Sequence, residues 1–182
     1  MKALIFFANG TEEVEALTPL DYLRRAGVET LLVGVSGKTQ TGSHGITVET
    51  DIAAADLPFD VDFDLLVFPG GMPGTDNIER SPVAKALLTR AADENKFIAA
   101  ICAAPKILGS AGLLKGKKAT CYPGFEKYLV GAEISGEKAV RSGNIITATG
   151  AGAANEFAFA LISALFGAKK ADDIAKSVRF LI

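Results

Sequence analysis

The stretch Phe97-Ile98-Ala99-Ala100-Ile101-Cys102-Ala103-Ala104-Pro105 passes from a continuously apolar run into the start of a helix through a single cysteine. Such a run is typical of a strand that is buried on both faces of a parallel sheet. Cys102 stands at the first residue of the turn, with alanines close by on both sides. Bulky neighbours would clash in so tight a turn. The pattern therefore predicts a nucleophile elbow that lifts Cys102 above the carboxyl ends of the strands.

Strand-like runs alternate with helical patterns along the whole chain. The expected strands span residues 3–8, 30–35, 65–68, 97–101, 118–121 and 144–149. This alternation is the βαβ signature of an α/β fold, with a mainly parallel sheet and helices on both of its faces. Because the sequence shows no repeat, linker or low-complexity tract, we expect one compact domain over residues 1–182.

The helical patterns have recognisable ends. The expected helices span residues 11–25, 103–111, 153–166 and 172–178. Another begins at Ser81-Pro82, where serine is a good N-cap and proline suits the first helical position. Between Gly37 and Thr50 glycines punctuate the chain and Ile46-Thr47-Val48 alternates, so we interpret this segment as a β-hairpin or excursion at the edge of the sheet.

Composition and charge argue against several classes of protein. The formal net charge is -2, and no cluster of Lys or Arg indicates nucleic-acid binding. The apolar run at residues 3–8 is too short to span a bilayer, and no convincing cleavage site follows it. We therefore expect a cytoplasmic protein without membrane partners. The two cysteines, Cys102 and Cys121, make no disulfide framework and are expected to be reduced thiols.

The helix that follows Cys102 should favour its thiolate. Unpaired N–H groups and partial positive charge at a helix N-terminus stabilise an anion there. A thiol with a pKa near 8.5 is only about 3% ionised at pH 7, whereas a pKa lowered by about three units makes it almost wholly thiolate. The alternative is a buried cysteine that acts as a small apolar side chain. Sequence context alone leaves both interpretations open.

A second candidate is Glu15, in the stretch Asn9-Gly10-Thr11-Glu12-Glu13-Val14-Glu15 after the first strand. The end of that strand reaches the same edge of the sheet as Cys102. The other acids of this stretch are interpretable as surface charges that suit the start of a helix. Glu15 lies beside the helix face that carries Leu17. Burial near a cysteine would raise its pKa, and the protonated carboxyl could donate a hydrogen bond to the sulfur.

A glycine pair, Gly70-Gly71, follows the strand expected at residues 65–68. Its backbone N–H groups could form an oxyanion hole or anion nest above the sheet. Most such pairs are only turns, so this evidence is weak alone. The pair matches neither a dinucleotide fingerprint nor a phosphate loop, and we expect no cofactor.

His44 is the one histidine and lies in the expected hairpin. It could act as a base for Cys102 only if its own chain or a partner subunit brings it within hydrogen-bond reach. An exposed loop histidine is the alternative. One histidine and two distant cysteines make no recognisable zinc site, so we expect no bound metal.

Four segments together resemble the DJ-1/ThiJ/PfpI superfamily, and the resemblance runs nearly end to end. They are Gly10-Thr11-Glu12-Glu13-Val14-Glu15, Pro69-Gly70-Gly71, Ala100-Ile101-Cys102-Ala103-Ala104-Pro105, and Gly150-Ala151-Gly152 with Glu156-Phe157. The closest similarity is to the DJ-1-like branch. The resemblance implies a flavodoxin-like three-layer α/β/α sandwich and a homodimer.

The resemblance also implies roles for single residues. Cys102 matches the reactive cysteine and Glu15 the glutamate that hydrogen-bonds it. Backbone at Gly71 and Ala103, with Gly70 beside them, matches the anion or oxyanion pocket. In the DJ-1-like branch this cysteine oxidises readily to sulfinate. The family has been assigned cofactor-independent glyoxalase activity, deglycation, redox sensing and chaperone activity.

Three positions depart from the family pattern. Ala103 stands where the protease branch has a histidine, which argues against a protease. Tyr122 precedes Pro123 where the DJ-1-like branch often has a histidine, and tyrosine is a poor base at neutral pH. His44 corresponds to a position that is often an arginine across the dimer interface, which would place it near the site or the interface.

The resemblance favours an enzyme that acts on a small aldehyde or dicarbonyl, or on glycated groups. Cys102 would be its nucleophile and Glu15 its proton shuttle, with Tyr122 and His44 as possible accessory residues. The alternative is a redox-sensing or chaperone-like protein that acts through oxidation of Cys102 with little turnover. A third possibility is a fold whose cysteine reacts only incidentally.

Overall fold

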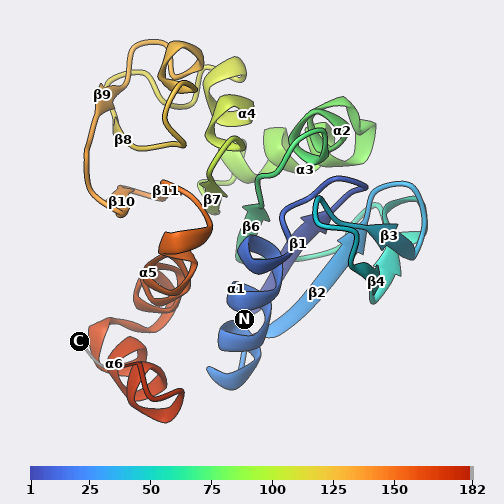
Figure 1. The fold of residues 1–182 in the computed structure, drawn as a ribbon, viewed down its shortest axis with the longest axis horizontal. Coiled ribbons are helices and arrows are strands. Elements are labelled where there is room, and N and C mark those ends of the chain that lie inside the picture. Colours follow the sequence, from blue (N-terminus) through green and yellow to red (C-terminus); the bar gives the residue numbers. More distant parts are fainter. Residues whose placement is uncertain (181–182) are drawn as a thin grey trace.

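The computed structural model describes residues 1–180, which form a sheet covered by helices on both faces (Figure 1). The sheet has seven strands in the order β10-β11-β7-β6-β1-β2-β5, and only β10 runs antiparallel to its neighbour. These strands are β1 (Lys2–Phe7), β2 (Glu29–Gly34), β5 (Ile52–Ala53), β6 (Leu65–Phe68), β7 (Phe97–Ile101), β10 (Ala139–Ser142) and β11 (Ile145–Ala148). The expected mainly parallel α/β/α sandwich is confirmed.

The helices divide between the two faces of the sheet. They are α1 (Glu13–Arg25), α2 (Gly74–Arg80), α3 (Pro82–Asp93), α4 (Pro105–Ser110), α5 (Ala154–Phe166) and α6 (Ala168–Ser177). In Figure 1, α1, α5 and α6 lie on one side of the sheet, while α2, α3 and α4 lie on the other. No helix in the described part of the chain has the length and apolar character needed to cross a bilayer.

The core consists of two apolar layers, one on each side of the sheet. Along β1, Leu4 and Phe6 point into one layer, whereas Ala3, Ile5 and Phe7 point into the other. All five are fully buried, because successive side chains of a strand alternate between faces and both faces are covered. This burial explains why the strands next to the site read as continuous apolar runs.

Two small sheets lie outside the central one. The segment between Gly37 and Thr50 forms the expected hairpin, from β3 (Thr39–Thr41) and β4 (Thr47–Glu49). The prediction for residues 118–121 is only partly right. Strand β8 (Lys118–Ala119) pairs with β9 (Glu133–Ile134), away from the central sheet. Strand propensity along the chain does not reveal which strand will be the partner.

Further differences concern elements that sequence periodicity does not reveal. Helix α2 was not expected, because it is a short, mostly polar helix of seven residues directly after Pro73. Helix α6 begins at Ala168 rather than residue 172, since Gly167 has a φ of 88° and separates it from α5. Ala171, Ile174 and Ala175 form its buried stripe.

Candidate active site

Cys102 occupies a sharp turn between β7 and α4. Its φ is 65°, a left-handed conformation that costs a non-glycine residue about 1–2 kcal/mol. Two backbone hydrogen bonds hold it: its N–H donates to the Ala148 carbonyl at 2.9 Å, and its carbonyl accepts from the Tyr122 N–H at 2.8 Å. Strand β11 and the segment at Tyr122 thus hold the strained turn, and the predicted elbow is present with Cys102 partly exposed.

Gly70 allows the turn after β6 to lie against both Cys102 and Glu15. A Cβ at Gly70 would lie 2.6 Å from the Cβ of Cys102 and 2.6 Å from Oε2 of Glu15. The Gly70 N–H donates to that same Oε2 at 2.9 Å. Any larger residue would therefore push apart the two side chains that define the site.

Glu15 is almost completely buried at the start of α1. Burial, together with the nearby charge of Glu12, raises the pKa of its carboxyl group to about 7. Hydrogen bonds from the Cys102 side chain and from the amides of Gly70 and Ala151 act in the opposite direction. Its other oxygen, Oε1, is buried and has no hydrogen-bond partner of regular geometry in the described residues. The expectation of a raised pKa for Glu15 is met.

The expectation of a lowered pKa for Cys102 is wrong for this resting geometry. Burial, together with the charge of Glu15 and its contact with the sulfur, raises the pKa of the Cys102 thiol to about 12. The backbone amides of Gly71 and Ala103 act in the opposite direction, as the helix-start argument anticipates. Desolvation of the sulfur and the neighbouring carboxylate outweigh this effect of the helix start.

Glu15 and Cys102 titrate as a coupled pair, because the Cys102 thiol lowers the Glu15 pKa through a hydrogen bond, while the charged Glu15 carboxylate raises the pKa of the thiol. Two of the causes that raise the Cys102 pKa require an ionised Glu15. When Glu15 holds the proton, they vanish and the carboxyl becomes a donor to the sulfur. The pair with one proton can therefore exist either as thiol and carboxylate or as thiolate and carboxylic acid.

The expected anion pocket lies on the same side of Cys102. The amides of Gly71 and Ala103 both interact with the sulfur closely enough to lower its pKa. Gly71 has a φ of 83°, and a Cβ there would lie 2.3 Å from the Glu12 nitrogen, so this turn requires glycine. The structure thus brings Cys102, Glu15, Gly70, Gly71 and Ala103 together.

Tyr122 lies beside this group. A Cβ at Gly150 would lie 3.3 Å from the Tyr122 ring and 3.8 Å from Oε1 of Glu15. About half of the tyrosine remains exposed, with a relative exposure of 51%. It can therefore form a wall of the opening.

His44 lies in the turn between β3 and β4 and contacts the start of α1 rather than Cys102. Its Nδ1 is 2.9 Å from Oε2 of Glu13 and 3.8 Å from Oε1 of Glu12. The pKa of His44 is raised by its hydrogen bond and ion pair with Glu13. No contact between His44 and Cys102 is present among the described residues, so its placement near the site or the interface stays a prediction.

Glu12, Glu13 and His44 are close enough together to hold a metal ion. The oxygens of Glu13, however, already accept hydrogen bonds from the backbone N–H groups of His44 and Ile46 and from the side chains of Ser43 and His44. The same contacts fasten the hairpin to α1, which accounts for the cluster without an ion.

Sequence reasoning missed Lys106, in the first turn of α4. Its ammonium contacts Asp76 and, at 3.1 Å, Glu79 on α2. It thereby links the helix after the Gly70-Gly71 turn to the helix after Cys102. A lysine at a helix N-terminus opposes the helix dipole, and that mismatch was the available signal.

Cys121 is free and buried, and burial raises the pKa of its thiol to about 11, as suits a structural residue.

Comparison with known proteins agrees with this geometry. Residues 1–164 match the model of the DJ-1/PfpI family. The chain is 35% identical to Protein dj-1beta of Drosophila melanogaster over 97% of this chain and 95% of that protein. It is 39% identical to Protein DJ-1 homolog A of Arabidopsis thaliana over 94% of this chain, but spans only 45% of that longer relative.

The solved structure of oxidised Toxoplasma gondii DJ-1 matches with a TM-score of 0.93 and 34% identity, covering 97% of both chains. A protein from Pyrococcus horikoshii that is named a deglycase is 35% identical over 74% of this chain and 80% of its own length. With its cysteine elbow, buried glutamate and sandwich fold, the chain belongs to the DJ-1/PfpI family, in its DJ-1-like branch.

Proposed function

We propose that this protein is a cofactor-independent, stress-protective enzyme that uses Cys102 to act on reactive dicarbonyls or glycated groups. The observation that carries the proposal is the buried Glu15 carboxyl, with a pKa near neutrality, in contact with a strained cysteine elbow. A group that titrates near the working pH is suited to both giving and taking a proton. Two archaeal relatives that are named deglycases also support an activity on glycated groups.

With methylglyoxal as the substrate, the proposed reaction converts the dicarbonyl to lactate through a hemithioacetal and a thioester on Cys102. The Cys102 sulfur attacks the aldehyde carbon, and the aldehyde oxygen takes the proton held by Glu15 to give a hemithioacetal. Glu15 then removes the proton from that carbon and returns it to the adjacent carbon, while the hydroxyl proton passes from the first oxygen to the former ketone oxygen. The ketone thereby becomes an alcohol, and the sulfur-bearing carbon becomes a thioester carbonyl. Water cleaves the thioester, which releases lactate and restores the thiol.

The amides around the sulfur have a defined part in these steps. Negative charge develops on the former aldehyde oxygen during attack, and the N–H groups of Gly71 and Ala103 are available to stabilise it. Tyr122 would border the opening through which the substrate enters. His44 would act only if a partner subunit brought the active site within its reach.

Lactate formation from methylglyoxal tests the proposal. Wild type should produce lactate, Cys102→Ser and Glu15→Gln should lose turnover by at least about a hundredfold, and Cys121→Ser should retain it. The Cys121 variant is a matched control, since it removes the other thiol of the chain. Equal lactate production by wild type and Cys102→Ser would reject the proposal.

A second candidate function is redox sensing, with little turnover. Tyr122 stands where a family histidine is often found, and the Toxoplasma gondii DJ-1 structure is described as oxidised. Two equivalents of peroxide would each transfer one oxygen to the Cys102 sulfur and leave as water, which gives a sulfinate. A protonated Glu15 could then donate a hydrogen bond to a sulfinate oxygen.

Mass spectrometry after mild peroxide treatment distinguishes the two functions. A sensor should gain two oxygen atoms on Cys102 without losing its fold, and Glu15→Gln should change the yield of that species. The absence of any sulfinate on Cys102 at low peroxide excess would reject redox sensing while leaving the enzyme proposal untouched.

A further inference from the structure

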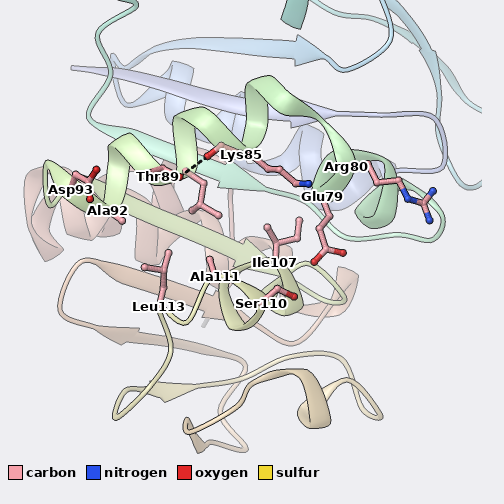
Figure 2. A pocket seen from close by; sticks show the side chains of 11 residues that line it. Glu79, Arg80, Lys85, Thr89, Ala92, Asp93, Ile107, Ser110, Ala111 and Leu113 are labelled. Atoms are coloured by element: carbon pink, nitrogen blue, oxygen red, sulfur yellow. Dashed lines mark hydrogen bonds between the residues drawn. The ribbon is translucent and has the colours of Figure 1, made fainter.

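A groove of about 700 Å³ lies between the end of α2, α3 and α4, and none of its lining residues belongs to the candidate active site (Figure 2). Its floor is apolar and consists of Leu88 and Ala92 on α3, Ile107 on α4 and Leu113 after it. This volume is within the range of roughly 300–1,000 Å³ that is usual for small-molecule sites. The groove is therefore large enough for a ligand with an apolar body.

Two cations without acidic partners stand at one end of the groove. Arg80 and Lys85 line it, both are exposed, and neither has a carboxylate within 4.0 Å in the described part of the chain. The nearby acid, Glu79, is already 3.1 Å from the ammonium of Lys106. In Figure 2 the Lys85 side chain extends toward this end, where Glu79 and Arg80 lie.

The opposite end of the groove has the opposite charge. Asp93, the last residue of α3, lies there, and it also has no cationic partner within 4.0 Å among residues 1–180. Lys85 and Asp93 are eight residues apart on one helix, which corresponds to about 12 Å. An anionic group would be attracted to one end and repelled from the other, so the groove has a preferred direction.

We propose that this groove binds an amphipathic organic anion, with its acidic group at Arg80 and Lys85 and its apolar body along Leu88, Ala92 and Ile107. The charge asymmetry selects an anion over a cation of the same shape. The apolar floor contributes binding through the surface it removes from water. A medium-chain carboxylate, about two helical turns long, has the required shape.

Isothermal titration calorimetry with octanoate tests the proposal, with octan-1-ol and octyltrimethylammonium as probes of matched chain length. Wild type should bind octanoate at one saturable site, and bind the alcohol and the cation more weakly. Arg80→Gln/Lys85→Gln should weaken octanoate binding about tenfold, from the loss of two partly exposed ion pairs, and barely change octanol binding. Lys38→Gln/Lys169→Gln removes the same net charge elsewhere and should leave octanoate binding unchanged.

A second variant tests the apolar part of the site. Ala111 lines the groove and is exposed, so Ala111→Trp should fill the groove without disturbing the core and weaken both octanoate and octanol. Ala168→Trp, exposed at the start of α6, is its control. The proposal would be overturned if wild type showed no saturable octanoate binding. It would also be overturned if Arg80→Gln/Lys85→Gln and Ala111→Trp left octanoate binding unchanged, or if Lys38→Gln/Lys169→Gln weakened it as much as Arg80→Gln/Lys85→Gln.

Discussion

At the scale of single residues, the site depends on two side chains held in unfavourable states. Cys102 has a left-handed backbone, and Glu15 has a buried carboxyl group with one unpartnered oxygen. Neither state benefits stability, and both bear on reactivity: the turn presents the sulfur, and burial brings the carboxyl pKa to neutrality. Each cost can be measured separately.

The strain at Cys102 should appear in a comparison of two small substitutions. Cys102→Gly should be more stable than Cys102→Ala by about 1 kcal/mol, because glycine adopts a φ of 65° without steric cost. Urea unfolding of both variants measures the difference. At Ala103, which has no such strain, the same Ala→Gly change should destabilise. A Cys102→Gly variant less stable than Cys102→Ala would show that the turn is not strained.

The buried carboxyl of Glu15 should make stability fall as the pH rises. Its pKa is about 7 in the native state and 4.5 as its ordinary value, so between these pH values the native state binds more protons than the unfolded state. The contribution is fully present below pH 4.5 and is lost as the pH rises through 7, by about 3 kcal/mol.

Denaturant unfolding between pH 4.5 and 8 measures this effect. In Glu15→Gln, the free energy of unfolding should not show this decline as the pH rises. Glu49 is an exposed acid on β4, so Glu49→Gln should show the same decline as wild type. Parallel pH profiles for wild type and Glu15→Gln would contradict the raised pKa.

At the scale of elements, the two halves of the anion pocket sit on separate segments. One follows β6 and continues into α2, while the other follows β7 and continues into α4. Lys106 joins these helices through Asp76 and Glu79, and its ammonium also lies 5.5 Å from the centre of the Tyr128 ring. It is thus a positioning residue that touches no reacting atom.

Removing this link should loosen the pocket. Lys106→Met leaves two partly buried carboxylates without their cation, and we expect a loss of about 1–2 kcal/mol in stability. It should also slow alkylation of Cys102 severalfold at pH 7, and Lys106→Arg should restore much of the rate. A loss of stability with unchanged Cys102 reactivity would show that Lys106 is only structural.

Apolar runs and turn residues were sufficient to predict β6, β7 and the elbow, because strands buried on both faces contain little else. The local pattern also identified Glu15, which is polar but borders an apolar helix face. Lys106 and the position of β8 could not be predicted, since their partners lie far away in sequence. The Cys102 pKa was mispredicted because burial of the sulfur beside Glu15 is a tertiary property.

At the scale of the whole molecule, the family resemblance implies a homodimer, and we propose the face of α1 and the hairpin as its interface. Val14 and Ile46 are about half exposed and line one shallow hollow with Leu17. Sedimentation velocity should give twice the chain mass of 18.9 kDa. Val14→Glu should give the monomer mass, and Val130→Glu, at an exposed site elsewhere, should not. A wild-type monomer at micromolar concentration would contradict the proposal.

The fold as a whole supplies what the pair of Cys102 and Glu15 needs, because three parallel strands end at the same edge of the sheet. β1 leads to Glu15, β6 to the glycine pair and β7 to Cys102. The central claim is that these two side chains share one proton. It can be tested without knowledge of the physiological substrate.

The most direct test is the rate of Cys102 alkylation by iodoacetamide as a function of pH, in wild type and Glu15→Gln. The pair with one proton has two forms: Cys102 thiol with Glu15 carboxylate, and Cys102 thiolate with Glu15 carboxylic acid. Because both forms hold one proton, the ratio between them does not depend on pH. The wild-type rate should therefore rise through pH 7 to a plateau above it and rise again only at much higher pH, whereas Glu15→Gln should show a single rise without that plateau. One identical sigmoid in both proteins would contradict the shared proton.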